Sequence, residues 1–470
     1  MMAHAQQKAG ITREVVPDDL RGMARRLASR GDDAAARAAY VRLLQVDPTD
    51  HDALVELGSL AAAGGYIAAA RTVFAQAVQY YPESAVARVG LAQALIEGED
   101  ISQAVAHCQI ALRVQPGMAA AHRALAHCLD SQGDPRAAAH RHLGYCGHAV
   151  VQPRTRMAGQ LRVLLLVAAR GGNISVQGWF DPTMWAVTAV YADYLGPDAL
   201  LPAHDLVVNA IGDADYAGSA LAAATRRMGQ FGAPVINRPD AVQGTGRETI
   251  ARRLATLPGV VMPRLRSLSR DEAASISQFP VLLRTPGYHT GQHFERADDR
   301  RGLCRALVGL PGARLLAIDY AETRGPGGFW RKFRVLIIDG VIYPVHLAVS
   351  DQWKVHYFTA AMAAHPSHRD EEQRFLRDMA GVLGATAMRA LAAIGVALGL
   401  DYAGVDFACC DDGSVLVFEA NATMVAPPPS DEPIWDYRRP ALAAIAQAVQ
   451  AMLARRCPAG AHPHREQMVG

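Results

Sequence analysis

The stretch GVDFACCDDGSVLVFEANATM, residues 404–424, decides how the second half of this chain folds. Two apolar runs flank the dipeptide Asp412-Gly413, and such a dipeptide is a strong signal for a β-hairpin with a two-residue turn. That turn would place Asp406 of the first strand directly opposite Glu419 of the second. Two opposed carboxylates need an explanation, because like charges repel at this separation.

The polar residues of the second strand share one face of the predicted hairpin. Asn421 lies two residues beyond Glu419 and shares its face, as do Val415 and Val417. Directly opposed Cβ atoms lie about 4.5–5.5 Å apart, so Asp406 and Glu419 repel each other unless one is protonated or a cation lies between them. Carboxylate and amide oxygens favour Mg²⁺ or Mn²⁺. The alternative is a polar hairpin face that is exposed to solvent.

The first third of the chain contains a repeat. Pro48, Pro82 and Pro116 recur with the 34-residue period of tetratricopeptide (TPR) repeats. The same period links three further sets of positions: Gly31, Gly65 and Gly133; Leu57, Leu91 and Leu125; and Arg37 with Arg71. Helical patterning between the prolines predicts about three helix pairs and a terminal helix over residues 17–147, stacked as a short solenoid.

Small residues at the expected helix contacts would let neighbouring helices of this solenoid approach closely. They are Ala36, Gly58, Ala70 and Ala92. A solenoid of this kind presents a concave face to a peptide, protein or carrier partner, forms a homodimer, or braces an adjoining domain. The repeats alone favour none of these roles over the others.

A different architecture follows a predicted linker at residues 148–160. Continuous apolar runs in LRVLLLVA, HDLVVNAIGDAD and PVIN alternate with a helical pattern, which predicts a small parallel α/β domain over residues 161–262. The glycine loop GGN could bind phosphate, although such turns are common after strands. The segment GTGRET, residues 244–249, lacks the spacing of a Walker A loop.

Residues 263–455 show a second pattern of strands and helices, and residues 456–470 are a tail. The expected strands lie in FPVLLRTPGYHTGQHFERA, RLLAIDYAE, FWRKFRVLIIDGVIYPVHLAVS and the closing hairpin. One long helix or two short ones are expected over residues 371–400. One segment is dense in side chains that either shape an acceptor pocket or pack at the surface: His346, Ser350, Trp353, Lys354, His356 and Tyr357.

The composition restricts the functional classes. A formal net charge of +2 over 470 residues gives no electrostatic reason to expect nucleic acid or an anionic membrane as a partner. The 7 cysteines include no CxxC pair, which argues against a disulfide framework or a zinc site. The first residues lack the apolar segment of a secretion signal, and the run VLLLVAA is too short to span a bilayer. We therefore expect a cytoplasmic protein.

Four segments between residues 160 and 455 together resemble the ATP-grasp superfamily. GVDFACCDDGSVLVFEANATM is similar to its metal-binding strands, and FPVLLRTPGYHTGQ to its nucleotide strand and glycine-rich flap. RKFRVLIIDG is similar to its strand with a phosphate-facing arginine, and RLLAIDYAE to its adenine hinge. The resemblance implies a small α/β pre-grasp domain and two α+β subdomains that clasp ATP. The predicted fold class is therefore a TPR solenoid followed by an ATP-grasp fold.

The resemblance also implies roles for individual residues. The implied ligands of Mg²⁺ (or Mn²⁺) are Asp406, Glu419 and Asn421. Arg284 stands where the family has a phosphate-binding lysine, which is a departure because arginine and lysine differ in reach and geometry. Arg334, assisted by Lys332, would contact the γ-phosphate or the acyl-phosphate formed from it. The implied flap and hinge residues are Gly287, His289, Thr290 and Gly291, and Asp319, Tyr320 and Glu322, with Glu322 as a ribose ligand.

An enzyme with these features would be an ADP-forming ligase. It would activate a small-molecule or peptide carboxylate as an acyl-phosphate and couple it to an amine or other nucleophile, with the TPR region docking a peptide, protein or carrier partner. Two alternatives stay open. One is a TPR interaction protein with a degenerate ATP-grasp domain, and the other is an ATP-grasp phosphotransferase that forms no new C–N bond.

Overall fold

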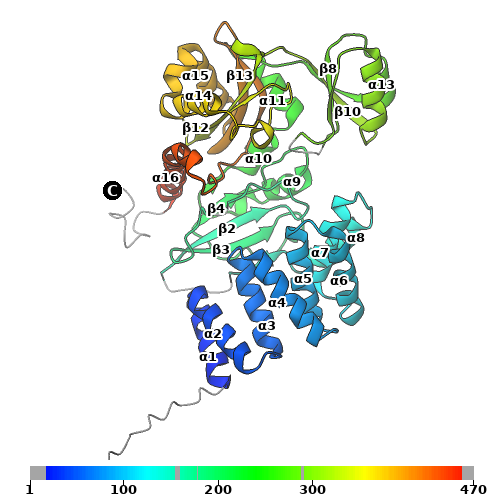
Figure 1. Cartoon of the computed structure of the whole chain (residues 1–470), viewed down its shortest axis with the longest axis vertical. Helices are drawn as coiled ribbons and strands as arrows, with labels where there is room; N and C mark the ends of the chain where they lie inside the picture. Colours follow the sequence, from blue (N-terminus) through cyan, green and yellow to red (C-terminus); the bar gives the residue numbers. More distant parts are fainter. Residues whose placement is uncertain (1–16, 154–158, 177, 287–290, 458–470) are drawn as a thin grey trace, which may run out of the picture. The chain divides into compact units, whose positions relative to one another are not determined.

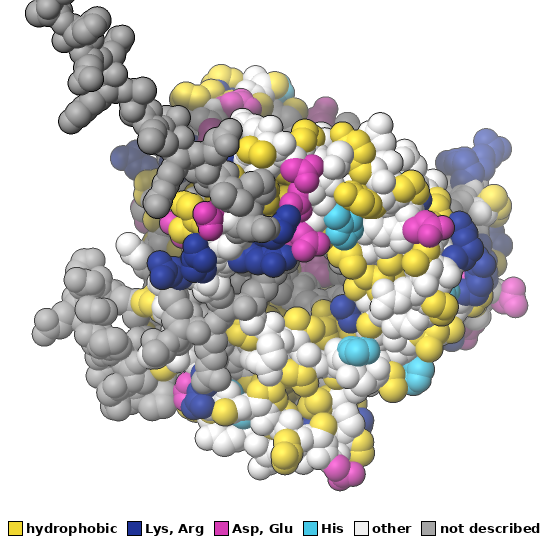
Figure 2. Space-filling model, turned by 90° about the horizontal axis from the view of Figure 1, so that it is seen from below, with side chains coloured by type: hydrophobic (Ala, Val, Ile, Leu, Met, Phe, Trp, Pro, Cys, Tyr) yellow, Lys and Arg dark blue, Asp and Glu magenta, His cyan; other side chains and the backbone are white. Residues whose placement is uncertain are grey.

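The computed structural model describes residues 17–153, 159–176, 178–286 and 291–457. The chain divides into two compact units, residues 1–160 and 161–470. Figure 1 shows helices side by side in the first unit, and sheets with helices packed against them in the second. On the face drawn in Figure 2, basic and acidic side chains lie among hydrophobic and uncharged ones, as the balance of 47 Lys and Arg against 45 Asp and Glu predicts.

The described part of the first unit contains eight helices in four consecutive pairs. They are α1 (Pro17–Ser29), α2 (Asp33–Val46), α3 (His51–Ala63), α4 (Ile67–Tyr80), α5 (Ala85–Glu97), α6 (Ile101–Val114), α7 (Ala119–Ser131) and α8 (Ala137–Tyr145). This is a TPR-like helical repeat, as predicted. The predicted count of helices was one too small, because the short α8 completes a fourth pair. A two-residue strand, β1 (Val150–Val151), lies inside the predicted linker.

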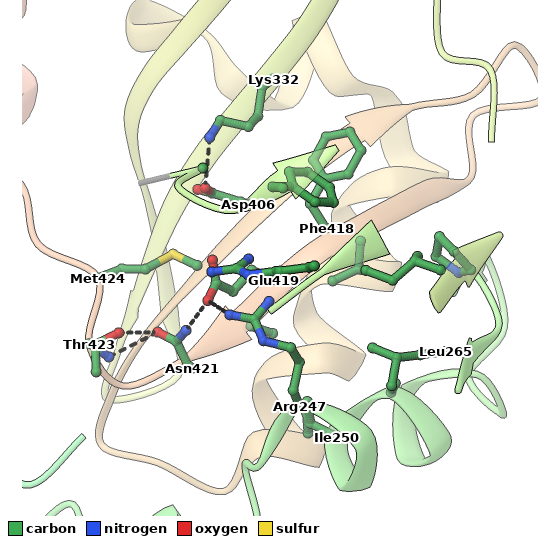
Figure 3. Close-up of a pocket in the computed structure, with 18 of the residues that line it drawn as sticks. Arg247, Ile250, Leu265, Lys332, Asp406, Phe418, Glu419, Asn421, Thr423 and Met424 are labelled. Carbon is green, nitrogen blue, oxygen red and sulfur yellow. Dashed lines mark hydrogen bonds and ion pairs between the residues drawn. The ribbon is translucent and has the colours of Figure 1, made fainter. Parts of the chain in front are cut away.

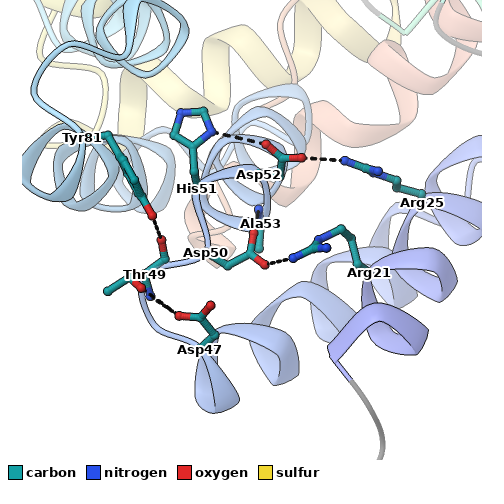
Figure 4. A network of polar contacts seen from close by, with 9 residues as sticks. All are labelled: Arg21, Arg25, Asp47, Thr49, Asp50, His51, Asp52, Ala53 and Tyr81. Atoms are coloured by element: carbon teal, nitrogen blue, oxygen red, sulfur yellow. Dashed lines mark hydrogen bonds and ion pairs between the residues drawn. The ribbon is translucent and has the colours of Figure 1, made fainter.

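Polar side chains fix the ends of these helices and join the first pair to the second. The Asp50 carboxylate accepts a hydrogen bond from the Ala53 N–H at the start of α3 and forms an ion pair with Arg21 of α1. Arg25 of α1 similarly pairs with Asp52 at 2.9 Å (Figure 4). Such caps are typically worth about 1 kcal/mol each, because they satisfy N–H groups that have no partner within the helix.

Close packing in the first unit centres on the Phe74 ring of α4. A Cβ atom placed on Gly90 of α5 would lie 2.4 Å from this ring, and one on Gly58 of α3 would lie 2.9 Å from it. The four predicted contact positions are buried, as expected; they are Ala36, Gly58, Ala70 and Ala92. The repeat thus uses two glycines to admit one aromatic side chain between three helices.

We expect Gly90→Ala to destabilise the first unit by about 1–3 kcal/mol, because the new methyl group overpacks the contact with Phe74. Gly22→Ala in α1 is the matched control, since its Cβ would meet only the flexible end of Arg26 at 3.3 Å. It should be neutral or stabilising by up to about 1 kcal/mol, the helix propensity difference. Urea unfolding followed by circular dichroism at 222 nm measures both. Equal effects of the two substitutions would contradict the packing explanation.

The second unit begins with a small parallel sheet, in agreement with the predicted α/β architecture. Its strands β2 (Leu161–Val167), β3 (Trp185–Tyr191), β4 (Leu206–Asn209) and β5 (Val235–Ile236) are paired in parallel in the order β3-β2-β4-β5. The accompanying helices are α9 (Gly218–Arg226), the 3-10 helix η1 (Met228–Gln230), α10 (Pro239–Gln243) and α11 (Arg247–Leu254). β4 is buried along its whole length, as is typical of parallel sheets covered on both faces.

Two further sheets complete the second unit. A four-stranded antiparallel sheet has the order β7 (Leu265–Ser269), β10 (Arg314–Asp319), β8 (Val281–Arg284) and β9 (Phe294–Ala297), with helices α12 (Arg270–Ala274) and α13 (Arg300–Gly309). A five-stranded sheet has the order β12 (Val341–Ser350), β11 (Trp330–Ile338), β13 (Tyr402–Cys409), β14 (Val415–Asn421) and β6 (Val260–Val261). Its helices are α14 (Pro366–Arg377), α15 (Met379–Leu398) and α16 (Arg439–Arg456), with 3-10 turns η2 (Pro326–Gly328), η3 (Tyr357–Thr359) and η4 (Pro433–Arg438).

α15 is the helix expected over residues 371–400 as one long or two short pieces. Its backbone leaves helical geometry at Gly384, with φ 78° and ψ 167°, so it is a helix with a break after its first turn. Among the described residues it is the one helix long and apolar enough to cross a membrane by length and composition. Its buried side chains, such as Leu391 and Ile394, belong to the face that packs on the five-stranded sheet.

The closing hairpin has the predicted pairing but not the predicted turn. Cys410 and Ser414 form the last paired positions, so the loop has three residues and ends in Gly413 with φ 78°. The extra loop residue would move Asp406 away from Glu419. A β-bulge at Phe418 restores the alignment, and Asp406 does lie opposite Glu419.

The bulge changes which apolar side chains share the Asp406 face of the hairpin. Leu416 lies opposite Ala408 and Val417 opposite Phe407. Leu416 is therefore on the face of Asp406, and the prediction that Val415 and Val417 share this face was wrong. The predicted alternation failed because one extra residue reverses the facing of every residue between the turn and the bulge.

The parallel sheet and the five-stranded sheet are joined by a buried asparagine. Asn237 follows β5 and has a positive φ of 52°. Its backbone N–H donates to the Asp401 carboxylate, its side-chain amide donates to the Tyr402 carbonyl, and its side-chain oxygen accepts from the Tyr402 N–H, each at 2.8 Å. The strand β6 also pairs in parallel with β14. The predicted boundary at residue 262 thus separates segments that share hydrogen bonds.

Candidate functional site

A cavity of about 1180 Å³ lies among the three sheets of the second unit. It is lined by loops that follow β2 and β4, by the antiparallel sheet, and by the strands β11, β13 and β14. Most predicted site residues in the described part of the chain line it: Arg284, Gly291, Asp319, Tyr320, Lys332, Arg334, Asp406, Glu419 and Asn421. The flap residues Gly287, His289 and Thr290 lie outside the described residues.

Four charged or polar residues form a row across the five-stranded sheet. Arg334 of β11 lies opposite His346 of β12 on one side and opposite Asp406 of β13 on the other. Glu419 of β14 lies opposite Asp406. Directly opposed residues share a face of the sheet, so the strand pairing itself aligns a histidine, a cation and two carboxylates.

Asp406 is enclosed by two cations. Arg334 donates to both carboxylate oxygens, with Nε at 2.6 Å from Oδ1 and a terminal nitrogen at 2.9 Å from Oδ2, and Lys332 Nζ lies 3.1 Å from Oδ2. The Asp406 side chain is only 4% exposed. Burial alone would raise its pKa, but Lys332 and Arg334 hold the pKa of Asp406 well below its usual range. Asp406 therefore stays ionised and orients both cations.

Glu419 and Asn421 lie together at the cavity wall (Figure 3). Glu419 Oε1 accepts a hydrogen bond from the Asn421 amide at 3.0 Å and pairs with Arg247 at 2.6 Å. Asn421 Oδ1 in turn accepts from the backbone and side chain of Thr423, each at 2.9 Å. The pair of side chains is thus oriented by its neighbours and still partly accessible from the cavity.

The donor set fits a hard divalent cation in its chemistry. Carboxylate and amide oxygens from Glu419 and Asn421 adjoin at the cavity wall, and Asp406 lies opposite Glu419. These are the ligand types of Mg²⁺ and Mn²⁺. Within the described residues there is no group of three His, Cys, Asp or Glu side chains that could hold a metal. A metal here would therefore need the asparagine or oxygens of a ligand.

Arg284 enters the cavity from β8 of the antiparallel sheet. Burial and the neighbouring Arg247 lower the pKa of Arg284 to about 10, while Glu419 and Asp213 act in the opposite direction. The guanidinium carbon lies 5.9 Å from the centre of the Phe294 ring. Arg284 and Arg247 therefore lie close enough to repel each other, with Glu419 near both. An anion bound between the two arginines would relieve this repulsion.

The hinge residues divide into two groups. Asp319 and Tyr320 line the cavity, and Tyr320 lies beneath the guanidinium of Arg296 at 4.1 Å. Glu322 Oε1 instead accepts hydrogen bonds from the backbone of the next two residues at 3.1 and 3.0 Å and from the Trp330 ring at 3.0 Å. Glu322 thus holds the hinge loop in shape, and its ribose role stays a prediction.

The segment proposed to shape an acceptor pocket is also divided. Trp353, Lys354 and His356 line the cavity, and Lys354 Nζ donates to the Phe294 carbonyl of β9 at 3.1 Å. Three other members of the set are not on the cavity wall. His346 and Ser350 are buried in β12, and Tyr357 donates to the fully buried Glu372 at 3.2 Å.

We expect His346 to make the second unit less stable at mildly acidic pH. Burial, and next Arg334, lower the pKa of His346 well below its ordinary value. Below about pH 6.5 the His346 imidazole binds a proton in the unfolded chain but not in the folded one. The free energy of unfolding therefore falls by up to about 1.4 kcal/mol per pH unit as the pH is lowered. His346→Phe should remove the contribution of His346 to this slope and leave those of His356 and His368, whose pKa values burial also lowers. His148→Asn, at an exposed position in the first unit, should leave the slope unchanged. All 5 tryptophans lie in the second unit, so their fluorescence reports its unfolding.

No protein-family model matches the chain, and no curated protein matches it. The similar solved structures include MamA from Desulfovibrio magneticus RS-1, which is 23% identical over 27% of this chain and 72% of that chain, with a TM-score of 0.26. YrrB, described as a TPR protein with an unusual peptide-binding site, is 20% identical over 29% of this chain and 73% of its own, with a TM-score of 0.27. The TPR-like character of the first unit is defined by its own helix pairs and their 34-residue period.

Arg247 is the main site residue that sequence reasoning missed. It is the first residue of α11, and its backbone N–H donates to the Asp215 carboxylate at 2.9 Å. The segment GTGRET that contains it resembles a phosphate loop only in composition, without the Walker A spacing. Its partner Glu419 is 172 residues away in the chain. A lone arginine at the start of a helix gives no sequence signal for a contact at that separation.

Proposed function

We propose that the second unit is an ATP-grasp enzyme that joins a carboxylate to an amine and releases ADP. The observation that supports this most directly is the charge of the cavity wall. Seven cations and five carboxylates of the described residues line the cavity, an excess of two positive charges, and four of these cations surround Asp406 and Glu419: Arg247, Arg284, Lys332 and Arg334. The positive excess suits a polyphosphate, because phosphoryl transfer depends chiefly on charge neutralisation and alignment.

The hinge side of the cavity suits the base of the nucleotide. Leu265, Leu282 and Leu416 line the cavity together with Ile318 and Tyr320 of the hinge. Apolar side chains around a flat ring, with backbone groups at its edge, are typical of small-molecule sites. This arrangement would leave the phosphates directed toward the cations described above.

The proposed reaction has two steps. A carboxylate oxygen of the substrate attacks the γ-phosphorus of ATP, the bond from that phosphorus to the β-γ bridging oxygen breaks, and ADP leaves. The amine nitrogen then attacks the acyl carbon and loses a proton. The bond from that carbon to the oxygen that had attacked the phosphorus breaks, so inorganic phosphate departs with this oxygen, and the other carboxylate oxygen remains in the amide. Arg334 and Lys332 would hold the transferred phosphoryl group throughout, since Asp406 fixes both cations in place.

Glu419 and Asn421 would hold the magnesium ion that this chemistry uses, with Asp406 beside them. A bound Mg²⁺ supplies neutralisation of phosphate charge and alignment of the leaving group. Arg284 and Arg247 would contribute the remaining positive charge toward the phosphates. No acid–base residue is required at the phosphorus itself.

The test is nucleotide binding and turnover by the full chain. Calorimetry with ATP and Mg²⁺ should show binding, and a screen of carboxylate–amine pairs should identify pairs that stimulate ADP release. Lack of nucleotide binding up to millimolar ATP would reject the proposal. Binding without ADP release for any pair would favour the interaction-protein alternative. A stable phosphorylated product without C–N bond formation would favour the phosphotransferase alternative.

A second proposed role belongs to the first unit, which would dock a peptide, protein or carrier partner. Its support is the stack of TPR-like pairs, in which the first helices of successive pairs, α3 with α5 and α5 with α7, pack on each other. Deleting residues 17–147 should then raise KM for a peptide-borne substrate and leave KM for its small-molecule analogue unchanged. Equal effects on both substrates would argue against docking.

A further inference from the structure

Glu419 and Asp406 are both held by cations, but in different ways. The cations on Asp406 come from β11, next to β13 in the same sheet, and their positions are fixed by strand pairing. The Arg247 side chain comes from a helix of the parallel-sheet region and reaches Glu419 across the cavity wall. The Arg247 and Glu419 side chains are 21% and 27% exposed, whereas that of Asp406 is 4% exposed. Of the two carboxylates, Glu419 is therefore the one that a ligand can reach.

The backbone of Arg247 can stay in place while its side chain moves. Its N–H is fixed by Asp215, and Gly246 before it packs closely enough that a Cβ there would lie 2.8 Å from Asp215 Oδ1. The guanidinium stands at the end of a long flexible side chain, in a cavity of about 1180 Å³. Arg284 also lies near enough to Arg247 that the two cations repel. The flexible side chain and the repulsion from Arg284 both favour movement of the Arg247 guanidinium from Glu419 to an anion that enters the cavity.

We propose that Arg247 occupies the metal position on Glu419 in the ligand-free protein and gives it up only when a nucleotide brings its phosphates. Oε1 of Glu419 already accepts from Arg247 and from Asn421, so a divalent cation alone would have to displace a protein cation. Nucleotide phosphates offer Arg247 a new anionic partner. Metal uptake is therefore coupled to nucleotide. The identity of the displacing ligand rests on the proposed function.

The experiment measures Mn²⁺ binding to the full chain by electron paramagnetic resonance, without nucleotide. Wild type should bind Mn²⁺ weakly. Arg247→Gln should bind Mn²⁺ at least about tenfold more tightly, because the positive charge that competes with the metal for Glu419 is removed. Adding Glu419→Gln to Arg247→Gln should abolish the gain. Arg247→Lys, which keeps the charge, should behave like wild type. Arg252→Gln is the control on the same helix, since Arg252 is 71% exposed and pairs only with Glu248 among the described residues.

Two results would overturn the inference. One is equal Mn²⁺ affinity in wild type and Arg247→Gln, and the other is tight Glu419-dependent Mn²⁺ binding by wild type alone. If Arg247→Gln does not fold, the Mn²⁺ affinity of wild type is compared with and without ADP. Equal affinity in the two conditions would reject the coupling of metal uptake to nucleotide. Nucleotide binding is measured separately, so its absence would reject the proposed enzyme while the comparison without nucleotide still tests the Arg247 pair.

Discussion

Glu419→Gln should reduce ADP release by at least about 100-fold, the scale on which a single preorganised electrostatic contact acts in catalysis. Glutamine keeps the size of the side chain and its bond to Asn421, but it removes the negative charge that would bind metal and that now pairs with Arg247. The measurement is ADP production with the best carboxylate–amine pair from the screen. Tryptophan fluorescence and the unfolding midpoint should stay near the wild-type values, because the side chain is 27% exposed.

Glu248→Gln provides the matched control for this prediction. Glu248 lies on α11 next to Arg247, and its carboxylate pairs only with the exposed Arg252 in the described part of the chain, at 3.5 Å. Its loss should leave ADP release within about twofold of wild type, because exposed helix pairs contribute little. Unchanged turnover in Glu419→Gln would mean that the hairpin of β13 and β14 takes no part in ADP release. It would also reject the proposed magnesium ligands.

Asp406→Ala should destabilise the second unit by about 3–5 kcal/mol, because removing one partner of a buried ion pair leaves the others uncompensated. Here two cations, Lys332 and Arg334, would lose their shared carboxylate in a place where its side chain is 4% exposed. Urea unfolding followed by tryptophan fluorescence measures the loss. Because the pKa of Asp406 is depressed in the folded state, its contribution is present above about pH 4 and is lost as the pH falls further.

Glu371→Ala is the comparison for Asp406→Ala. Glu371 pairs with Arg331, a residue of the same strand as Lys332, but the two side chains are 25% and 21% exposed. We expect its loss to cost about 1 kcal/mol or less. A similar cost for both substitutions would mean that burial does not set the strength of the Asp406 cluster.

The repeat unit could be predicted from sequence because its signal is periodic. Pro48, Pro82 and Pro116 end three helices that the structure places at equivalent points of successive pairs. The short α8, with 9 residues, was not predicted as a separate helix, because a helix of that length has too few positions to show a clear hydrophobic periodicity. The break at Gly384 could be suspected but not located, because glycine is tolerated in helices without a kink.

The pairing of Asp406 with Glu419 was predicted correctly through two errors that cancel. The turn has one residue more than expected, and the bulge at Phe418 takes up the difference. Neither error could be seen in the sequence, because an Asp-Gly dipeptide suits both two-residue and three-residue hairpin loops. The predicted orientation of Val415 and Val417 was therefore wrong, although the predicted pairing of Asp406 with Glu419 was right.

The cation arrangement was outside the reach of sequence reasoning. Only the resemblance to the ATP-grasp superfamily predicts that Lys332 assists Arg334, and the bonds of both cations to Asp406 appear only in the folded sheet. Contacts such as that between Arg247 and Glu419 depend on how separate sheets pack, which local patterns do not encode.

The left-handed Asn237 has a consequence for how this protein could be rearranged. Its three hydrogen bonds to Asp401 and Tyr402 make the end of the parallel sheet part of the support for β13. Recombination or gene fusion near residue 160 would leave these bonds intact. A crossover near residue 262 would instead supply each half with a foreign partner, so that only chains with a compatible residue at both ends of the contact would yield a functional chimera.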